Sequence, residues 1–277
     1  MNADQYCQEK CAASGSSFYY SFLFLPPPQR RAIMALYAFC REVDDVVDEC
    51  RDLAIASAKL AWWRQEVGRM ADSQPQHPVG LALQAAGRQF NLPAAELLEI
   101  IDGMAMDLQQ ARYPDFASLA HYCYRVASVV GLLAAGIFGY RDERTRQYAR
   151  DLGMAFQLTN IIRDLGEDAR RGRIYIPQDE LQRFGVAAAD ILNAHYSDNF
   201  TALMQFQYER AAQYYTQALA ELPPADRKNQ RPGLIMAAIY RTLLEEIRAA
   251  QFQTLHQRIT LTPVRKLWLA LKTWVRA

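Results

Sequence analysis

Hydrophobic and polar positions follow a helical period along nearly the whole chain. Pro26 to Pro28 introduce the first long segment, and proline is favourable in the first turn of a helix. Proline, glycine and polar clusters separate the later segments. We therefore predict helices at about residues 26–50, 54–71, 78–90, 94–111, 115–139, 142–171, 196–221 and 231–257, and a shorter one from 264.

The pattern contains no convincing run of alternating strand residues and no β-hairpin signal. The 277 residues are enough for a large buried core, and no linker is long enough to separate two domains. We predict an all-α fold with a single domain over residues 1–277.

Composition narrows the class of protein. Lys and Arg number 31 and Asp and Glu number 30, so the net charge of +1 gives no indication of a nucleic-acid partner. Five cysteines, and an N-terminal segment that carries Asp4 and no apolar targeting stretch, predict reduced thiols in a cytoplasmic protein. Cys7 and Cys11 share a helix face, but no nearby His or third Cys supports a metal site there.

Two pairs of aspartates lie in different predicted helices, Asp44 with Asp48 and Asp164 with Asp168. Residues four apart lie on one helix face, with Cβ atoms roughly 6 Å apart. Asn160 extends the second pair by one turn. Either pair alone is also compatible with a solvated helix face. If the two stripes face each other, charges 4 Å apart repel by about 4 kcal/mol at an effective dielectric near 20, so cations must lie between them.

The ligand atoms indicate which cation. Carboxylate and amide oxygens without His or Cys suit Mg²⁺, with Mn²⁺ as an alternative. Mg²⁺ binds through few protein carboxylates and completes its shell with substrate phosphates, so the pattern predicts a diphosphate substrate. Arginines, which hold phosphate through planar forks of donors, flank both stripes. They are Arg41, Arg163, Arg170, Arg171 and Arg173.

The segment from Val126 to Tyr140 is the longest uncharged stretch, and it is shorter than the roughly 20 residues that span a bilayer. Its many Gly and Ala residues are typical of a core helix with close neighbours, and they can also leave volume for a long apolar ligand. A diphosphate site at the mouth of an apolar helical bundle favours a prenyl diphosphate substrate.

Several motifs in combination resemble the squalene and phytoene synthases, prenyltransferases that join two prenyl diphosphates head to head. They lie at residues 17–20, 36–48, 122–127, 157–168 and 173–177. Residues 17–22, 41–49 and 265–268 look most like the presqualene diphosphate synthases of bacterial hopanoid pathways. The resemblance implies an isoprenoid synthase helical bundle with a central active-site cavity.

The resemblance also implies roles for individual residues. Mg²⁺ binding falls to Asp44, Asp48, Asn160, Asp164 and Asp168, and the four aspartates together with Tyr122 form the catalytic set. Diphosphate binding falls to Arg41, Arg163, Tyr240 and Arg258, with Ser17, Tyr20, Tyr37, Tyr122 and Gln157 around the reacting ends. Each tyrosine is equally compatible with core packing in which its hydroxyl is satisfied locally.

The implied reaction condenses two farnesyl diphosphates to presqualene diphosphate and diphosphate. NADPH is not expected, because that subfamily stops at the cyclopropyl product and the chain carries no Gly-rich dinucleotide motif. Released diphosphate and a tyrosine are both candidate bases. Two alternatives stay open: a phytoene synthase that condenses two geranylgeranyl diphosphates, and a non-catalytic helical scaffold.

The last segment, residues 264–277, is basic and amphipathic. Its apolar positions are Leu267, Trp268, Leu271, Trp274 and Val275, and its cations are Arg265, Lys266, Lys272 and Arg276. Such a helix can lie on an anionic membrane, here the inner membrane surface, or close the bundle with Arg265 or Lys266 reaching the diphosphate. Downstream pathway enzymes are further candidate partners, and the oligomeric state has no signal in the sequence.

Overall fold

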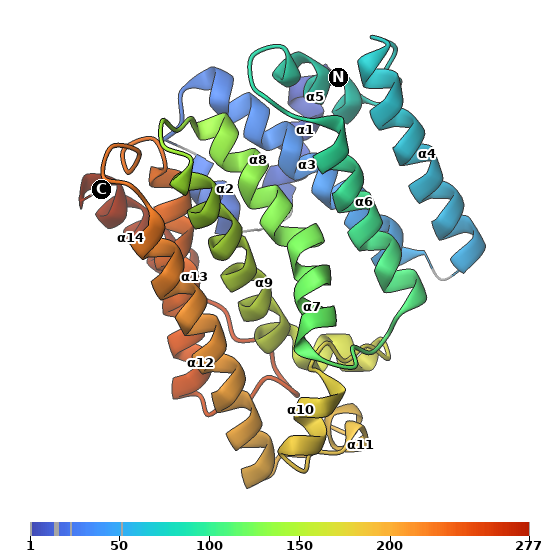
Figure 1. Ribbon diagram of the computed structural model, residues 1–277, viewed down its shortest axis with the longest axis vertical. Helices are drawn as coiled ribbons and strands as arrows, with labels where there is room; N and C mark the ends of the chain where they lie inside the picture. The colour runs from blue at the N-terminus through green and yellow to red at the C-terminus, as the bar shows by residue number, and fades with distance from the viewer. Residues whose placement is uncertain (1, 14–16, 23, 51, 277) are drawn as a thin grey trace.

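The computed structural model describes residues 2–13, 17–22, 24–50 and 52–276, and its regular elements are helices (Figure 1). The all-α prediction is confirmed. The longer helices begin and end close to the predicted positions. They are α3 (Pro27–Glu49), α4 (Leu53–Ala71), α5 (Pro78–Gly87), α6 (Ala94–Gln109), α7 (Phe116–Cys123), η1 (Tyr124–Ser128), α8 (Val129–Phe138), α9 (Arg144–Arg170), α12 (Asp198–Glu221), α13 (Arg231–Ala249) and α14 (Pro263–Arg276).

Three features depart from the helices predicted from the sequence. The helix predicted to reach residue 257 ends at Ala249, because Gln251 and Phe252 adopt positive φ angles of 50° and 57° and turn the chain back. Three short helices were not predicted, because one or two turns are too short to show a helical period in the sequence. They are α2 (Ser17–Phe22), α10 (Gln178–Arg183) and α11 (Ala188–Leu192). A further helix, α1 (Ala3–Ala13), buries Cys7 and Cys11, and all five cysteines are free thiols.

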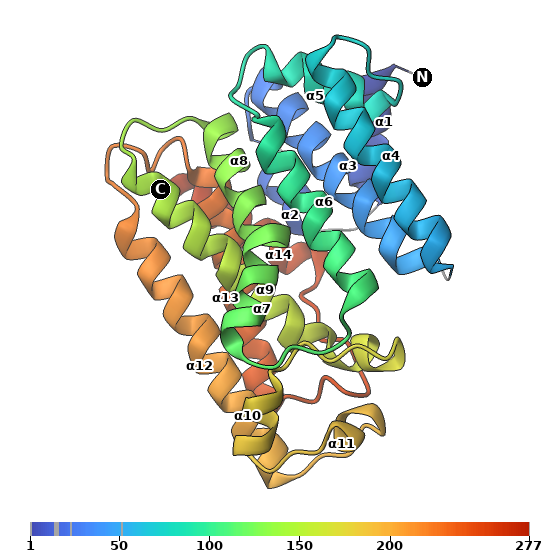
Figure 2. The same ribbon diagram turned by 45° about the vertical axis from the view of Figure 1, so that its right-hand side comes forward.

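Helices α8 and α9 lie in the middle of the molecule, with α3 to α6 on one side and α12 and α13 on the other (Figures 1 and 2). Two apolar clusters make up the core. One joins α9, α12 and α13, the other joins α1 and α3 to α6, and α8 contributes side chains to both. The space between the clusters is therefore bordered by α3, α8 and α9.

The rod formed by α7, η1 and α8 runs from Phe116 to Phe138. By length and composition it could cross a bilayer, but half of its most apolar stretch is buried, and it packs against α6 and α9. Its middle turn, Tyr124–Ser128, is a π-helix, a local widening that often occurs at functional sites. The segment from 126 to 140 therefore belongs largely to a central core helix, as one of its two interpretations predicted.

Glycines allow α9 to approach this rod closely. A Cβ atom added at Gly153 would lie 2.6 Å from the carbonyl oxygen of Ala127 and 2.7 Å from the Cα atom of Ser128. A real Cβ atom does not come so near to backbone, so helix α9 or the rod would have to shift. Gly153 therefore fixes the distance between the two central helices.

We expect Gly153→Ala to lower the free energy of unfolding by about 1 to 3 kcal/mol through overpacking, measured by urea denaturation. Gly68→Ala in α4 is the matched control. A Cβ atom there meets nothing within 4 Å, so this helical alanine should stabilise the protein by about 0.5 to 1 kcal/mol. Equal unfolding midpoints for the two variants would contradict the close packing at Gly153.

Candidate active site

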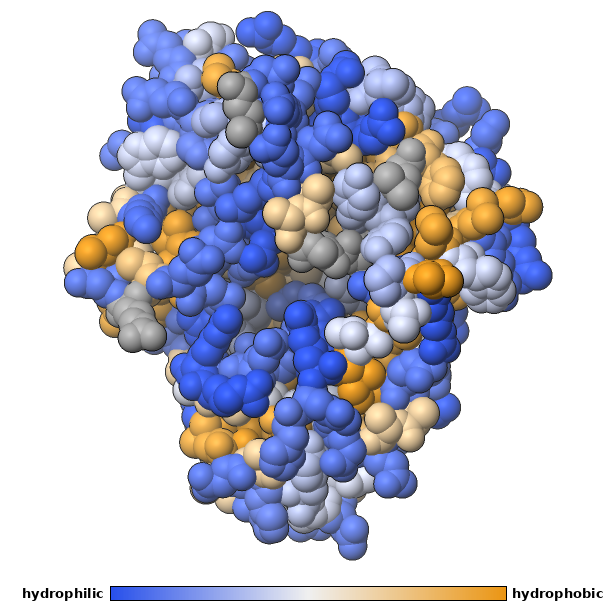
Figure 3. All heavy atoms as spheres, turned by 180° about the vertical axis from the view of Figure 1, so that it is seen from behind, coloured by the Kyte–Doolittle hydropathy of each residue, from blue (hydrophilic) through white to orange (hydrophobic). Residues whose placement is uncertain are grey.

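The C-terminal halves of α3 and α9 border one polar pocket of about 400 Å³. Asp44 and Asp48 line it from α3, and Asn160, Asp164 and Asp168 line it from α9. The spacing of four residues places each set on one helix face, as predicted. On the face shown in Figure 3 the molecule is hollowed near its centre, and hydrophilic side chains border the opening.

Arginines neutralise three of the four motif carboxylates. Arg41 donates to Asp44 at 2.5 Å, and the Nε atom of Arg163 donates to Asp164 at 2.7 Å. Asp48 accepts from the two arginines that follow α9, at 2.7 Å from Arg171 and 3.0 Å from Arg173. These last bonds join the end of α3 to the end of α9 across the pocket. The pocket lining contains six carboxylates and five arginines, so its charges nearly balance without a ligand.

Arg258 reaches the pocket from the loop that follows α13. Its Nε atom donates to Asp164 at 2.8 Å. Gly166 makes this approach possible, since a Cβ atom there would lie 2.6 Å from the carbonyl oxygen of Thr254 and collide with Leu255. The glycine between Asp164 and Asp168 thus lets the loop lie directly on α9 and bring Arg258 over the stripe.

Asp168 and Asn160 carry oxygens without a protein partner. In the part of the chain that the structure describes, the Asp168 carboxylate forms no hydrogen bond or ion pair, and the buried Oδ1 atom of Asn160 accepts none. Burial, and then the charges of Asp164 and Asp107, raise the pKa of Asp168 to about 7. Burial likewise raises the pKa of Asp44 to about 6. Both carboxyl groups lie in surroundings that favour a nearby cation.

These donors fit Mg²⁺, which takes hard oxygen ligands and relies on substrate phosphates for the rest of its shell. Among the described residues no three His, Cys, Asp or Glu side chains converge tightly enough to hold an ion by themselves. An ion held here would need further oxygen ligands from outside the protein, and the arginines around the pocket suit a phosphate as their source.

Asp107, at the end of α6, is a pocket residue that the sequence did not reveal. Its Oδ2 atom accepts from the Tyr122 hydroxyl and its Oδ1 atom from the Tyr175 hydroxyl, both at 2.8 Å, and the two rings stack with centroids 5.2 Å apart. Burial raises the pKa of Asp107 to about 6 against the opposing effect of the Tyr122 hydrogen bond. The only signal in the sequence is a lone carboxylate in the last turn of an apolar helix.

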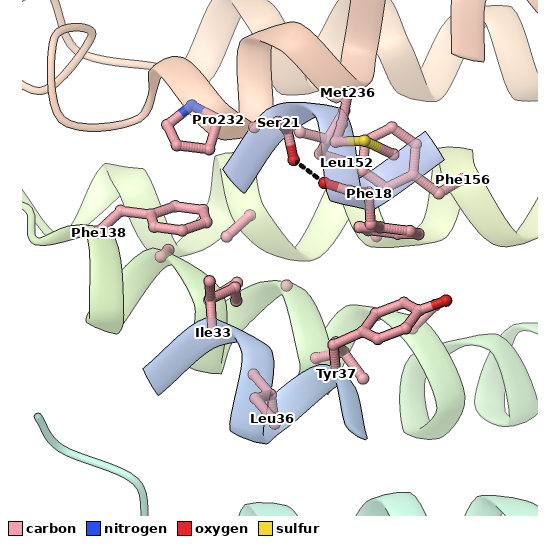
Figure 4. Close-up of a pocket in the computed structure, with 18 of the residues that line it drawn as sticks. Phe18, Ser21, Ile33, Leu36, Tyr37, Phe138, Leu152, Phe156, Pro232 and Met236 are labelled. Carbon is pink, nitrogen blue, oxygen red and sulfur yellow. Dashed lines mark hydrogen bonds between the residues drawn. The ribbon is translucent and has the colours of Figure 1, made fainter. Parts of the chain in front are cut away.

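An apolar cavity of about 190 Å³ continues from the polar pocket (Figure 4). Cys40, Val126, Gln157 and Asn160 line both spaces, so the two are contiguous. The small residues of α8 leave room, as the second interpretation of that segment predicted. Aromatic and aliphatic side chains from α2, α3, α8, α9 and α13 form the walls. Those labelled in Figure 4 include Phe18, Ile33, Leu36, Tyr37, Phe138, Leu152, Phe156 and Met236.

Phe138 and Pro232 line the end of the cavity away from Tyr37 (Figure 4), and Tyr148 is a further lining residue. Tyr148 is buried, and its hydroxyl has no hydrogen-bond partner among the described residues. Gly233 lies against this hydroxyl, because a Cβ atom at that position would collide with it. The cavity therefore adjoins the polar pocket and carries one buried hydroxyl without a partner in its lining.

Two other predicted site residues, Tyr20 and Tyr240, are not among the described residues that line the two spaces. Tyr240 is buried and packs against Phe156, with ring centroids 4.9 Å apart, and its hydroxyl forms a hydrogen bond with the pocket residue Arg163. The Nζ atom of Lys266 lies 6.0 Å from the centroid of the Tyr20 ring. The side chain of Ser17 lies outside the described residues. Arg170 donates to the carbonyl of Leu255 and does not line the pocket, so the phosphate contact expected of it is not supported.

Lys266, which the sequence left between several roles, points towards the cationic side of the site. Burial, and then the charges of Arg163 and Arg258, lower its pKa. Arg265 instead pairs with Glu246 at 2.7 Å. Of the two cations that α14 could direct to a diphosphate, the structure therefore places Lys266 near the site.

Comparisons with known proteins agree with this geometry. Residues 11–265 match the family model described as squalene/phytoene synthase. A 15-cis-phytoene synthase from Synechococcus elongatus is 34% identical over 94% of this chain and 89% of its own. The crystal structure of a dehydrosqualene synthase in complex with a ligand superimposes with a TM-score of 0.90, at 28% identity, over 99% of this chain and 96% of that one. Squalene synthase HpnC from Alicyclobacillus acidocaldarius gives 0.81 at 27% identity, over 90% and 94%. The expected isoprenoid synthase fold is confirmed.

Proposed function

Because the chain belongs to the squalene/phytoene synthase family, whose members are prenyltransferases, we propose that it joins two farnesyl diphosphates head to head. The products are presqualene diphosphate and diphosphate. The observation that carries this proposal is the continuity of the two spaces. A polar pocket whose donors fit Mg²⁺ and diphosphate shares lining residues with an apolar cavity, and we propose that this cavity holds a prenyl chain.

Asp44, Asp48, Asn160, Asp164 and Asp168 are the residues that would hold Mg²⁺. When bound, the ion supplies Lewis-acid stabilisation of the charge that develops on a departing diphosphate. The arginines contribute by changing partners. Each arginine already lies in the pocket and is paired with a carboxylate. Its N–H groups can therefore donate to a bound diphosphate without a large movement of the chain.

The cavity walls then protect the allylic cation that forms when the carbon–oxygen bond of the first diphosphate breaks. Apolar side chains exclude water from it. The faces of Phe18, Tyr37 and Phe156 offer negative π density to a cation. The alkene of the second substrate attacks, two carbon–carbon bonds close a cyclopropane, and one proton leaves. Released diphosphate and a tyrosine are the two candidate acceptors of that proton.

Two observations bear on chain length. The fifteen-carbon farnesyl chain is supported by the amino-acid sequences of the motifs. It is also supported by the backbone similarity to a dehydrosqualene synthase and a squalene synthase. The phytoene synthase relative, at 34% identity, supports the twenty-carbon geranylgeranyl chain as the second candidate. We choose farnesyl diphosphate, with Phe138 and Tyr148 closing the cavity behind its last isoprene unit.

Separate incubations with farnesyl and geranylgeranyl diphosphate, each with Mg²⁺, test this choice by mass spectrometry. We expect presqualene diphosphate from the first and little product from the second. Adding NADPH should leave presqualene diphosphate unconverted. A forty-carbon product from geranylgeranyl diphosphate would establish the phytoene alternative, and squalene on addition of NADPH would show that the reaction continues one step further. No product from either substrate would overturn the proposal.

A further inference from the structure

Helix α14 presents two different faces. Leu269 and Ala270 are buried, and Trp274 stacks on Phe24 with ring centroids 5.0 Å apart, so one face closes the bundle. The sequence alone placed Trp274 with Trp268, but the structure separates them. A second apolar face is exposed at intervals of three and four residues. This α14 stripe consists of Val264, Leu267, Trp268, Leu271 and Val275, which are 48% to 79% exposed.

A groove of about 410 Å³ runs beside the stripe, between α12, α13 and α14. Its floor is apolar, with Leu219, Leu234, Ala237, Ala238 and Leu269. Among the described residues that line the groove, four are cations and none is Asp or Glu. The cations are Arg227, Arg241, Lys272 and Arg276, and we call this feature the cationic groove. Within the described ranges none of the four side chains forms a hydrogen bond or an ion pair.

The stripe and the cationic groove form one continuous surface. On a helix, Lys272 and Arg276 lie one turn apart, along one edge of the stripe. The Nζ atom of Lys272 lies 4.5 Å from the centroid of the Trp268 ring, which joins the two features directly. Figure 3 shows hydrophobic side chains gathered on the side of the molecule where the C-terminal helix lies.

The charges and apolar side chains of this surface indicate the kind of partner that it binds. Unpaired cations above an apolar floor suit a phosphate that carries acyl chains, and an exposed stripe with tryptophan suits the boundary between headgroups and acyl chains. A free anion would leave the stripe uncovered. A second copy of this chain would meet the same patch across a two-fold axis and bring like charges together. We infer that the α14 stripe and the cationic groove dock on an anionic phospholipid bilayer, with a lipid phosphate in the groove.

The same helix also approaches the polar pocket, because the charges of the pocket residues Arg163 and Arg258 act on Lys266 in its first turn. The inference does not depend on which prenyl diphosphate is the substrate.

Two double variants test the surface by co-sedimentation with vesicles of phosphatidylcholine, with and without phosphatidylglycerol. The full chain should bind the anionic vesicles and not the neutral ones. Lys272→Gln/Arg276→Gln should weaken that binding about 30-fold, from the surface attraction of two cations. Trp268→Ala/Leu271→Ala should weaken it about 100-fold or more, from lost apolar burial. Both variants should keep the helical spectrum and the turnover of detergent-solubilised enzyme, since these side chains are exposed and lie outside the polar pocket.

Matched controls come from α4 and α5. Leu53→Ala/Ile55→Ala removes two apolar side chains of similar exposure, and Lys59→Gln/Arg88→Gln removes two exposed cations. We expect both controls to bind anionic vesicles like the parent chain. Equal binding to neutral vesicles, unchanged binding by both α14 variants, or equal losses in the controls would overturn the inference. It would also be overturned by a dimer that forms without lipid and dissociates on Trp268→Ala/Leu271→Ala, because the surface would then belong to a second copy.

Discussion

Replacing Asp44 or Asp164 with Asn should lower Mg²⁺-dependent turnover at least about 100-fold, a loss of roughly 2.7 kcal/mol in transition-state stabilisation. Each substitution keeps the size of the side chain and removes the charge that would hold the ion. It also removes one carboxylate partner from an arginine: Arg41 loses Asp44 but keeps Asp45 in the first case, and Arg163 loses Asp164 in the second. Turnover measured across a range of Mg²⁺ concentrations, with circular dichroism as the test of folding, gives the result.

Asp45→Asn is the matched control for this loss. Asp45 is the next residue along α3, but it pairs with Lys10 at 2.9 Å and with Arg41 at 2.6 Å and does not line the pocket. Its removal should change turnover by no more than about fivefold, the effect of one partly exposed ion pair. Near-normal turnover in Asp44→Asn or Asp164→Asn would exclude the metal-binding role. An equal loss in Asp45→Asn would assign the effect to the position of Arg41.

The sequence predicted the parts of the site that depend on local geometry. Asp44 with Asp48, and Asn160 with Asp164 and Asp168, share a helix face by spacing alone, and the cost of unbalanced charge predicts a cation between the two sets where they face each other. Residues joined by tertiary packing were beyond this reasoning. Asp107 and Tyr175 come from separate segments, and nothing local to either of them indicates that they form a hydrogen bond.

The same distinction applies to the fold. The long helices follow from periodicity, but the end of α13 depends on two non-glycine residues with positive φ, Gln251 and Phe252. The resulting loop carries Arg258 to Asp164, so this error in helix length concealed how one predicted site residue reaches the pocket. The faces of α14 were merged for a similar reason, because periodicity shows an apolar position and does not show what covers it.

Asp168→Asn should make the ligand-free protein more stable while abolishing most of its activity. Burial, and then the charges of Asp164 and Asp107, raise the pKa of Asp168 to about 7, well above the ordinary value for Asp near 3.9. A carboxyl group whose pKa is raised by folding favours the folded state only while it is protonated. The free energy of unfolding should therefore fall as the pH rises from about 4 to about 7 and level off above that. Discounted for partial exposure, the substitution should restore about 1 to 3 kcal/mol at pH 8 and little at about pH 4.

Asp164→Asn in the same stripe is the control, and we expect it to change the free energy of unfolding in the opposite direction. Burial alone would raise the pKa of Asp164, but the hydrogen bond and charge of Arg163, with the charge of Arg258, outweigh it and lower the pKa. This carboxylate stabilises the folded state above its unfolded pKa, so its removal should destabilise the protein by about 1 to 3 kcal/mol at pH 8. Thermal unfolding of both variants at about pH 4 and at about pH 8 measures the difference, at about 2 to 4 °C per kcal/mol. Mg²⁺ with diphosphate should raise the unfolding temperature of the parent chain more than that of Asp168→Asn, because only the parent keeps the carboxylate that attracts the ion. Destabilisation by Asp168→Asn at pH 8 would contradict this prediction. It would show that the Asp168 carboxylate stabilises the ligand-free protein through a partner within the chain.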